Sequence, residues 1–113
     1  MTRHSRPVRW LDFDIENAPR SYWLPDRPTA EITAIASCWT DDLSSMMVSL
    51  LHAGETPEEL LWAFLTRYNM ADGVTGHYIR KHDLPIINGA LMEWGMPLLG
   101  EKLACDTKLD MMK

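Results

Sequence analysis

Acidic residues alternate with apolar residues near the start of the sequence. Asp14 and Glu16 flank Ile15, at the end of a run rich in β-forming residues. Residues two apart on a strand point to the same face and lie roughly 7 Å apart along it, so these carboxylates can share one site. Like charges that close repel each other unless a cation lies between them. The pair therefore favours a site for Mg²⁺ or Mn²⁺, which prefer oxygen ligands.

The same pair has a simpler interpretation. Strands often end in acids that face solvent, and Asp-x-Glu alone is a weak indication of a metal site. A further acid, Asp83, follows Gly76, which permits close backbone approach at a strand end. Asp83 is also a good helix N-cap, a role that needs no metal. Both roles are compatible, because a capping Asp keeps one oxygen free for a cation.

Three stretches of the chain together resemble the DEDD-type, DnaQ-like 3′-to-5′ exonucleases, in particular the small versions encoded by bacteriophages. Residues 11–16 are similar to the first motif, an apolar strand that ends in Asp-x-Glu. Residues 76–78 and 82–85 resemble the second, Gly-His-Asn followed by an aromatic-Asp pair, with Tyr78 in place of Asn and His82 in place of the aromatic residue. Residues 103–108 are similar to the family's strand-to-helix Asp-Thr step.

The resemblance implies an α/β protein of the ribonuclease H-like fold and an enzyme of phage replication, recombination or repair. Asp14, Glu16 and Asp83 would be its catalytic metal ligands, holding two Mg²⁺ or Mn²⁺ ions that stabilise the attacking and leaving oxygens of a phosphodiester. The implied substrate is a single-stranded or frayed DNA 3′ end, with RNA as the alternative. The residues expected to bind that substrate are His77, Tyr78, Arg80 and Trp23.

The last motif of that family is a Tyr or His followed closely by a fourth carboxylate, on a helix downstream of anything in these 113 residues. The resemblance thus implies a fold that is incomplete at its C-terminus, or a partner chain that supplies the motif and its general base. Asp106 and Asp110 have helical spacing and are the candidates to replace the fourth carboxylate. Asp106 is expected first, however, as the N-cap of a helix that begins at Thr107.

Hydrophobic periodicity predicts a mixed sheet with helices on its faces. The expected strands are residues 8–15, 31–39, 45–51, 73–77 and 103–106, with residues 17–20 ending the first. One helix should begin at Thr56, with Pro57 in the first position and acids after it, and run to about Asn69. A second should run from Asp83 to Gly95.

Composition fits one domain over residues 1–113. A net charge of −5 argues against general attraction to nucleic acid, so such contact must be local, through bound cations with help from Arg80 and Lys81. No stretch approaches the ~20 apolar residues of a membrane helix, and no signal peptide is evident. Cys38 and Cys105 fit no disulfide framework. A cytoplasmic protein is expected, in the host cytoplasm if phage-encoded.

Other conspicuous residues are expected to be structural. The histidines His77 and His82 and the two cysteines match no zinc-ligand spacing. Four tryptophans lie in apolar periodicities and are expected in the core; they are Trp10, Trp39, Trp62 and Trp94. Trp23, in the Pro-rich loop after the first motif, is the candidate for stacking on a base.

Two function classes remain open. The first is the nuclease, which the ordered acidic motifs favour. The second is a non-catalytic remnant or interaction module that keeps the sheet and binds a partner chain through an exposed edge. A nucleic-acid-binding domain without chemistry is disfavoured by the negative charge.

Overall fold

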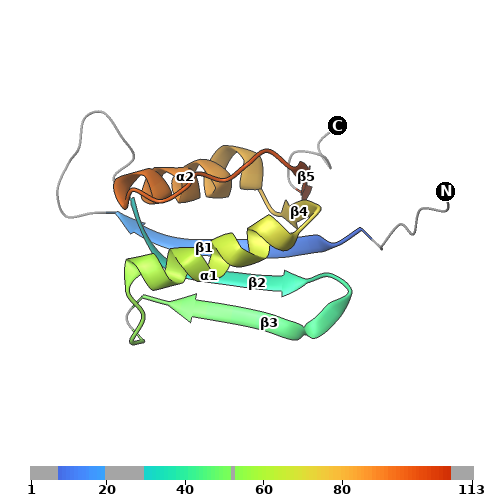
Figure 1. The fold of residues 1–113 in the computed structure, drawn as a ribbon, viewed down its shortest axis with the longest axis horizontal. Helices are drawn as coiled ribbons and strands as arrows, with labels where there is room; N and C mark the ends of the chain where they lie inside the picture. Colours follow the sequence, from blue (N-terminus) through green and yellow to red (C-terminus); the bar gives the residue numbers. More distant parts are fainter. Residues whose placement is uncertain (1–7, 20–29, 52, 108–113) are drawn as a thin grey trace.

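The computed structural model describes residues 8–19, 30–51 and 53–107. Five strands form one mixed sheet in the order β3-β2-β1-β4-β5 (Figure 1). Strands β1 to β3 pair antiparallel, while β4 pairs parallel to β1 and β5 parallel to β4. The elements are β1 (Trp10–Pro19), β2 (Ala30–Trp39), β3 (Asp42–Leu50), α1 (Pro57–Met70), β4 (Gly73–Gly76), the π-helical turn η1 (Ile79–Asp83), α2 (Leu84–Glu93) and β5 (Leu103–Asp106). This is the predicted ribonuclease H-like arrangement.

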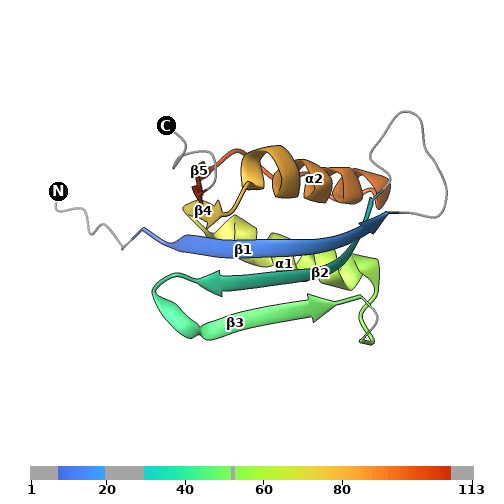
Figure 2. The same cartoon turned by 180° about the vertical axis from the view of Figure 1, so that it is seen from behind.

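The helices α1 and α2 pack on one face of the sheet. In β1, Leu11, Phe13 and Ile15 are buried on that face, whereas Asp12 and Asp14 are exposed on the other. Figure 2 shows this second side, where β1, β2 and β3 lie in front of α1. The alternation of β1 therefore turns its acids toward a face that neither helix covers.

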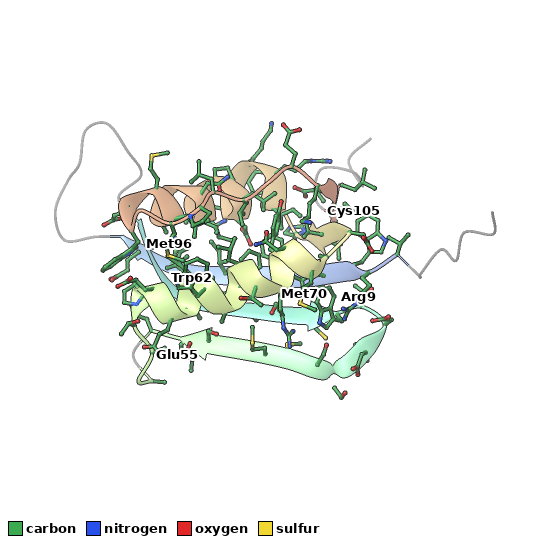
Figure 3. The ribbon with its side chains drawn as sticks, in the orientation of Figure 1. Arg9, Glu55, Trp62, Met70, Met96 and Cys105 are labelled. Carbon is green, nitrogen blue, oxygen red and sulfur yellow. The ribbon has the colours of Figure 1, made fainter. Side chains whose placement is uncertain are left out.

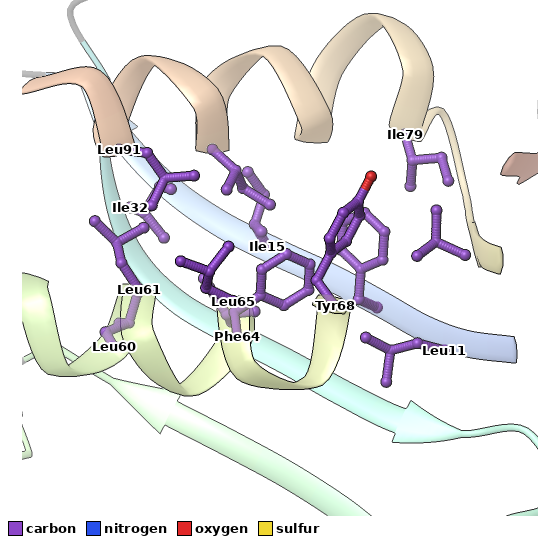
Figure 4. Close-up of a cluster of buried hydrophobic side chains, with 14 of the residues drawn as sticks. Leu11, Ile15, Ile32, Leu60, Leu61, Phe64, Leu65, Tyr68, Ile79 and Leu91 are labelled. Carbon is purple, nitrogen blue, oxygen red and sulfur yellow. The ribbon is translucent and has the colours of Figure 1, made fainter. Parts of the chain in front are cut away.

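The core lies between the sheet and the two helices (Figure 4). Phe64 of α1 is its centre, with its ring 5.0 Å from that of Phe13 and 5.9 Å from that of Tyr68. The helix α2 adds Ile87 and Leu91, which are both fully buried. This packing fixes α2, and with it the turn η1, over the middle of β1.

The start of α1 is as predicted. The Thr56 hydroxyl accepts a hydrogen bond from the Glu59 amide, and the Glu59 carboxylate accepts one from the Thr56 amide, both at 3.1 Å. Pro57 takes the first helical position, where no amide hydrogen is needed. This capping box satisfies two amide groups that the helix leaves without partners.

Some boundaries differ from the predictions. The strand β1 does not stop before Asn17 but continues to Pro19, because its pairing with β2 resumes after a bulge between Glu16 and Asn17. The strand β3 begins at Asp42, three residues early, directly after the turn. Tertiary pairing extends both strands beyond what local composition predicts. The Pro-rich loop that holds Trp23 and most of the helix expected from Thr107 lie outside the described residues.

The tryptophans are only partly core residues. Trp39 is buried, and the Arg9 guanidinium lies 3.7 Å from its ring centroid; Figure 3 shows Arg9 and Cys105 at the same end of the sheet. Trp62 and Trp94 are 47% and 43% exposed, so their prediction as core residues was wrong. Trp62 lies within α1, and Trp94 follows the last residue of α2, where it lines a hollow together with Ile32 and Leu61. No helix in the described part of the chain is long and apolar enough to span a membrane.

Candidate functional site

Three carboxylates of β1 form a row on the uncovered face of the sheet. Asp12, Asp14 and Glu16 are all exposed there, as the spacing of the strand predicts. Partial burial and the neighbouring charge of Asp14 raise the pKa of Asp12 above its ordinary value of 3.8. The row is therefore a region of negative charge that a cation would stabilise.

Two hollows flank this row and share Asp12 and Asp14. The larger has a volume of about 420 Å³ and is lined by Asp12, Phe13, Asp14, Gly76, His77 and Thr107. The smaller has a volume of about 150 Å³ and is lined by Asp12, Phe13, Asp14, Ala36, Ser37, Cys38 and Met46. Solvent, ions and small polar groups can thus approach the acids from both sides of β1.

Asp83 reaches β1 from the turn η1 and is only 3% exposed. Burial is the largest effect and raises the pKa of Asp83 above 3.8, and the charge of Asp14 raises it further. The hydrogen bond and charge of His82 and the amide of Ile15 act in the opposite direction, without cancelling the rise. Oδ1 lies 2.6 Å from His82 Nδ1. Oδ2 is buried and has no hydrogen-bond partner among the described residues. The fold thus brings Asp83 close enough to Asp14 for their charges to interact, as the motif order predicts.

Asp83 is not the N-cap that the sequence suggests. Its backbone is helical, with φ −67° and ψ −48°, and its side chain makes no capping hydrogen bond. The helical path already begins at Ile79, because the turn η1 runs directly into α2. The carboxylate of Asp83 is therefore not engaged by the first amides of α2, and its orientation toward β1 needs another explanation.

Close packing at the end of β4 sets the position of η1. A Cβ atom on Gly76 would lie 2.7 Å from the Phe13 carbonyl oxygen and 2.5 Å from Ile79 Cγ2. The close approach predicted at Gly76 is confirmed. Tyr78 then takes a left-handed conformation, with φ 61°, which turns the chain back along β1. An Asn adopts that conformation more readily than a Tyr does.

The candidates for substrate binding are spread around this junction. His77 is exposed in the wall of the larger hollow, and its Nδ1 lies 3.2 Å from the Thr107 hydroxyl. Tyr78 is half-buried beside it. Arg80 is exposed on the β5 side, where its guanidinium donates to the Ala104 carbonyl at 3.2 Å. Trp23 lies outside the described residues. Their roles toward a substrate stay predictions.

Sequence reasoning missed the role of Asp106. This residue is fully buried, and its carboxylate accepts hydrogen bonds from the amides of Tyr78, at 2.8 Å, and Arg80, at 3.0 Å. Whether it also caps a helix after Thr107 lies outside the described residues, as does Asp110. An acid that ends a short apolar strand was the available signal, but its partners are more than twenty residues away and only the fold identifies them.

The described residues contain no group of three His, Cys, Asp or Glu side chains placed to hold a metal ion as they stand. Among the acids, the charge of Asp14 raises the pKa of Asp83, so the two carboxylates interact electrostatically. Glu16 lies one step further along the same face, at the edge of the bulge.

No family model matches the sequence, and a search of curated proteins finds no match. Among solved structures, the chain is similar to the family B DNA polymerase from the hyperthermophilic archaeon Pyrobaculum calidifontis, with a TM-score of 0.69 and 17% sequence identity. The match covers 95% of this chain and 16% of the polymerase chain. At this identity the likeness shows the fold alone. It agrees with the mixed sheet and with the predicted fold class.

The raised pKa of Asp83 predicts an unusual dependence of stability on pH. The native state binds this proton more tightly than the unfolded state, so the wild type loses stability as pH rises from 3.8 through the raised pKa. In EDTA at pH 7, Asp83→Asn should therefore raise the free energy of unfolding, and the gain should shrink below about pH 4. Urea unfolding at both pH values measures it, with the exposed Asp41→Asn as control. A destabilised variant at pH 7 would contradict the expectation.

Proposed function

We propose that this chain carries the carboxylate part of a metal-dependent nuclease site, which removes nucleotides from the 3′ end of DNA. The observation that supports it most directly is the buried carboxylate of Asp83, whose Oδ2 has no hydrogen-bond partner among the described residues and whose pKa is raised by the charge of Asp14. A buried carboxylate with an unpartnered oxygen and an acidic neighbour is destabilising in itself. A divalent cation between the two acids would offset that cost.

The donor set suits Mg²⁺ or Mn²⁺. All the candidate ligand atoms are carboxylate oxygens, and Mg²⁺ commonly takes only one or two protein carboxylates, with waters and substrate phosphates completing its shell. His82 contacts Oδ1 of Asp83 and so leaves Oδ2 for an ion. Glu16 is exposed on the same face of β1 as Asp14. When bound, such ions supply Lewis-acid stabilisation and a reactive water at neutral pH.

The surroundings of the acids suit a nucleic-acid end. The uncovered sheet face and the hollow of about 420 Å³ leave room beside Asp12 and Asp14, and His77 and Thr107 offer polar atoms on the opposite wall. Without a cation this surface would repel phosphates, because the chain carries a net charge of −5. The proposed activity therefore depends strictly on metal.

The choice of DNA follows from two sources. The ordered motifs resemble 3′-to-5′ exonucleases, and the similar solved structure is, by its name, a DNA polymerase. RNA is the alternative substrate. The test is release of labelled nucleotides from single-stranded DNA that carries the label at its 3′ or its 5′ end, in Mn²⁺, Mg²⁺ or EDTA. Metal-dependent shortening from the 3′ end would support the proposal, and cleavage that persists in EDTA would overturn it.

Metal binding is a separate prediction, because the fourth carboxylate and the general base of the family are not among the described residues. Mg²⁺ at about 100 times its Kd should raise the free energy of unfolding by about 2.7 kcal/mol, since only the folded chain presents the site. Urea unfolding with and without Mg²⁺ measures it. Asp14→Ala should abolish the gain, and the exposed Asp41→Ala should keep it. An equal gain in both variants would argue against binding at Asp14.

A second candidate function is protein interaction through β3. Among the described strands, β3 has a neighbour on one side only, and its Leu43 and Val48 are 81% and 53% exposed. An edge strand with apolar side chains and no lysine is a ready template for another strand. If β3 serves this role, the wild type should self-associate at high concentration, and Val48→Lys should be monomeric. Sedimentation equilibrium checks this, and a monomeric wild type would remove the candidate.

A further inference from the structure

We propose that Asp106 is a positioning residue, whose buried carboxylate fixes the turn that places Asp83 against β1. The inference rests on the proposed function, since it concerns the metal affinity of that site. It assigns a role to a carboxylate of β5, which is separated from β1 by β4 in the sheet.

Both oxygens of Asp106 are used at the start of η1. Oδ1 accepts from the Tyr78 amide at 2.8 Å and Oδ2 from the Arg80 amide at 3.0 Å. These amides open the helical path that continues through η1 into α2, where amide groups lack partners within the helix. A carboxylate at that end also complements the positive end of the helix dipole. Because Asp106 is fully buried, both bonds are shielded from water.

The same two bonds hold an unfavourable conformation. Tyr78 has a φ of 61°, which a residue with a Cβ adopts only when its surroundings impose it. Asp106 fixes the amide of this residue and the amide two positions later, so it fixes the direction in which the turn leaves β4. Ile79, fully buried against Gly76, holds the turn from the opposite side.

Asp83 lies at the far end of this short turn. The Leu84 amide donates to the Ile79 carbonyl and the His82 amide to the Tyr78 carbonyl, so the five residues move as one unit. A shift at Tyr78 would therefore reach Asp83. The carboxylate of Asp83 makes no capping bond to α2. Its Oδ1 contacts His82, which belongs to the same turn, and the Ile15 amide of β1 lowers its pKa. Its place depends on the backbone of the turn, and the turn depends on Asp106.

The test compares two carboxylates that both accept backbone amides. Asp106→Asn replaces one acceptor oxygen with an NH₂ group that faces an amide hydrogen. Asp72→Asn is the matched control, because Asp72 accepts from the Arg9 amide at 2.8 Å at the opposite end of β4. Mn²⁺ binding is measured by electron paramagnetic resonance on the full chain, after circular dichroism has shown each variant to be folded.

We expect Asp106→Asn to weaken Mn²⁺ binding by at least about tenfold, the usual effect of losing a group that orients a metal ligand. Asp72→Asn should bind within about twofold of the wild type, because Asp72 lies at the end of β4 opposite to η1. Wild-type affinity in folded Asp106→Asn would overturn the proposal. A similar loss in both variants would also overturn it, since general loosening of the fold would then be sufficient.

Hydrogen exchange of the wild type decides the matter if Asp106→Asn does not fold. Without metal, the amides of Tyr78 and Arg80 should exchange as slowly as those of β4. Fast exchange that slows only when Mg²⁺ is added would show that the metal, not Asp106, orders the turn. If the wild type binds no metal, the proposed function fails, while slow exchange at these two amides would still show that Asp106 holds the turn.

Discussion

Replacing Asp14 with alanine should reduce the metal-dependent release of 3′ nucleotides by about 10³-fold. A metal ion commonly supplies several kcal/mol of stabilisation to the transition state, and about 4 kcal/mol corresponds to this factor. Asp14 is central to the site, because it lies in both hollows and its charge reaches Asp83. The measurement is the initial rate of release from 3′-labelled DNA at saturating Mn²⁺.

Asp12→Asn is the informative comparison. Asp12 lies on the same face of β1 as Asp14, and its substitution removes the same charge. Of these two acids, Asp14 is the one that raises the pKa of Asp83. We therefore expect a loss of less than about tenfold for this variant. Equal losses of activity in the two variants would mean that activity depends on the total negative charge of this face, and would contradict a site built around Asp14.

Gly76→Ala should destabilise the fold by about 2 to 3 kcal/mol and displace η1. The added methyl group would meet the Phe13 carbonyl oxygen, which belongs to the central strand and cannot move aside. Overpacking against backbone typically has this effect. The loss is measured by urea unfolding, and the same variant should bind Mn²⁺ more weakly, because Asp83 follows the turn.

Gly89→Ala is the control for Gly76→Ala, and it should change the free energy of unfolding in the opposite direction. Gly89 lies within α2, and a Cβ atom there would have no atom within 4 Å. Alanine in a helix is favoured over glycine by about 1 kcal/mol, so this variant should be more stable than the wild type. Destabilisation by both substitutions would contradict the close packing described at Gly76.

The sequence predicts most elements because their signals are local. The capping box at Thr56 and the apolar face of α1 follow from residues within one or two helical turns. The alternation of β1 likewise places Asp12, Asp14 and Glu16 on one face without knowledge of the partners of that strand. The order of the motifs then predicts that Asp83 lies near these acids. In the structure, the charge of Asp14 raises the pKa of Asp83.

The remainder depends on contacts between distant residues. Asp83 was predicted to be an N-cap because a helix was expected to begin there. Only the packing of Ile79 and the hydrogen bonds that Asp106 accepts show that the helical path starts earlier. Periodicity places Trp62 and Trp94 on helices but does not reveal whether another layer covers them. Both errors concern the tertiary contacts of a residue, and local sequence patterns do not reveal these contacts.

The strand β5 has only four residues and lies at the edge of the sheet, yet it carries Asp106. Short edge elements open with a smaller free energy than the core does. Partial opening of this edge would release the turn η1 while the core around Phe64 stays intact. On warming, the proposed affinity for metal would then be lost at a lower temperature than the secondary structure. During synthesis, the proposed site would likewise form only after residue 106 has left the ribosome.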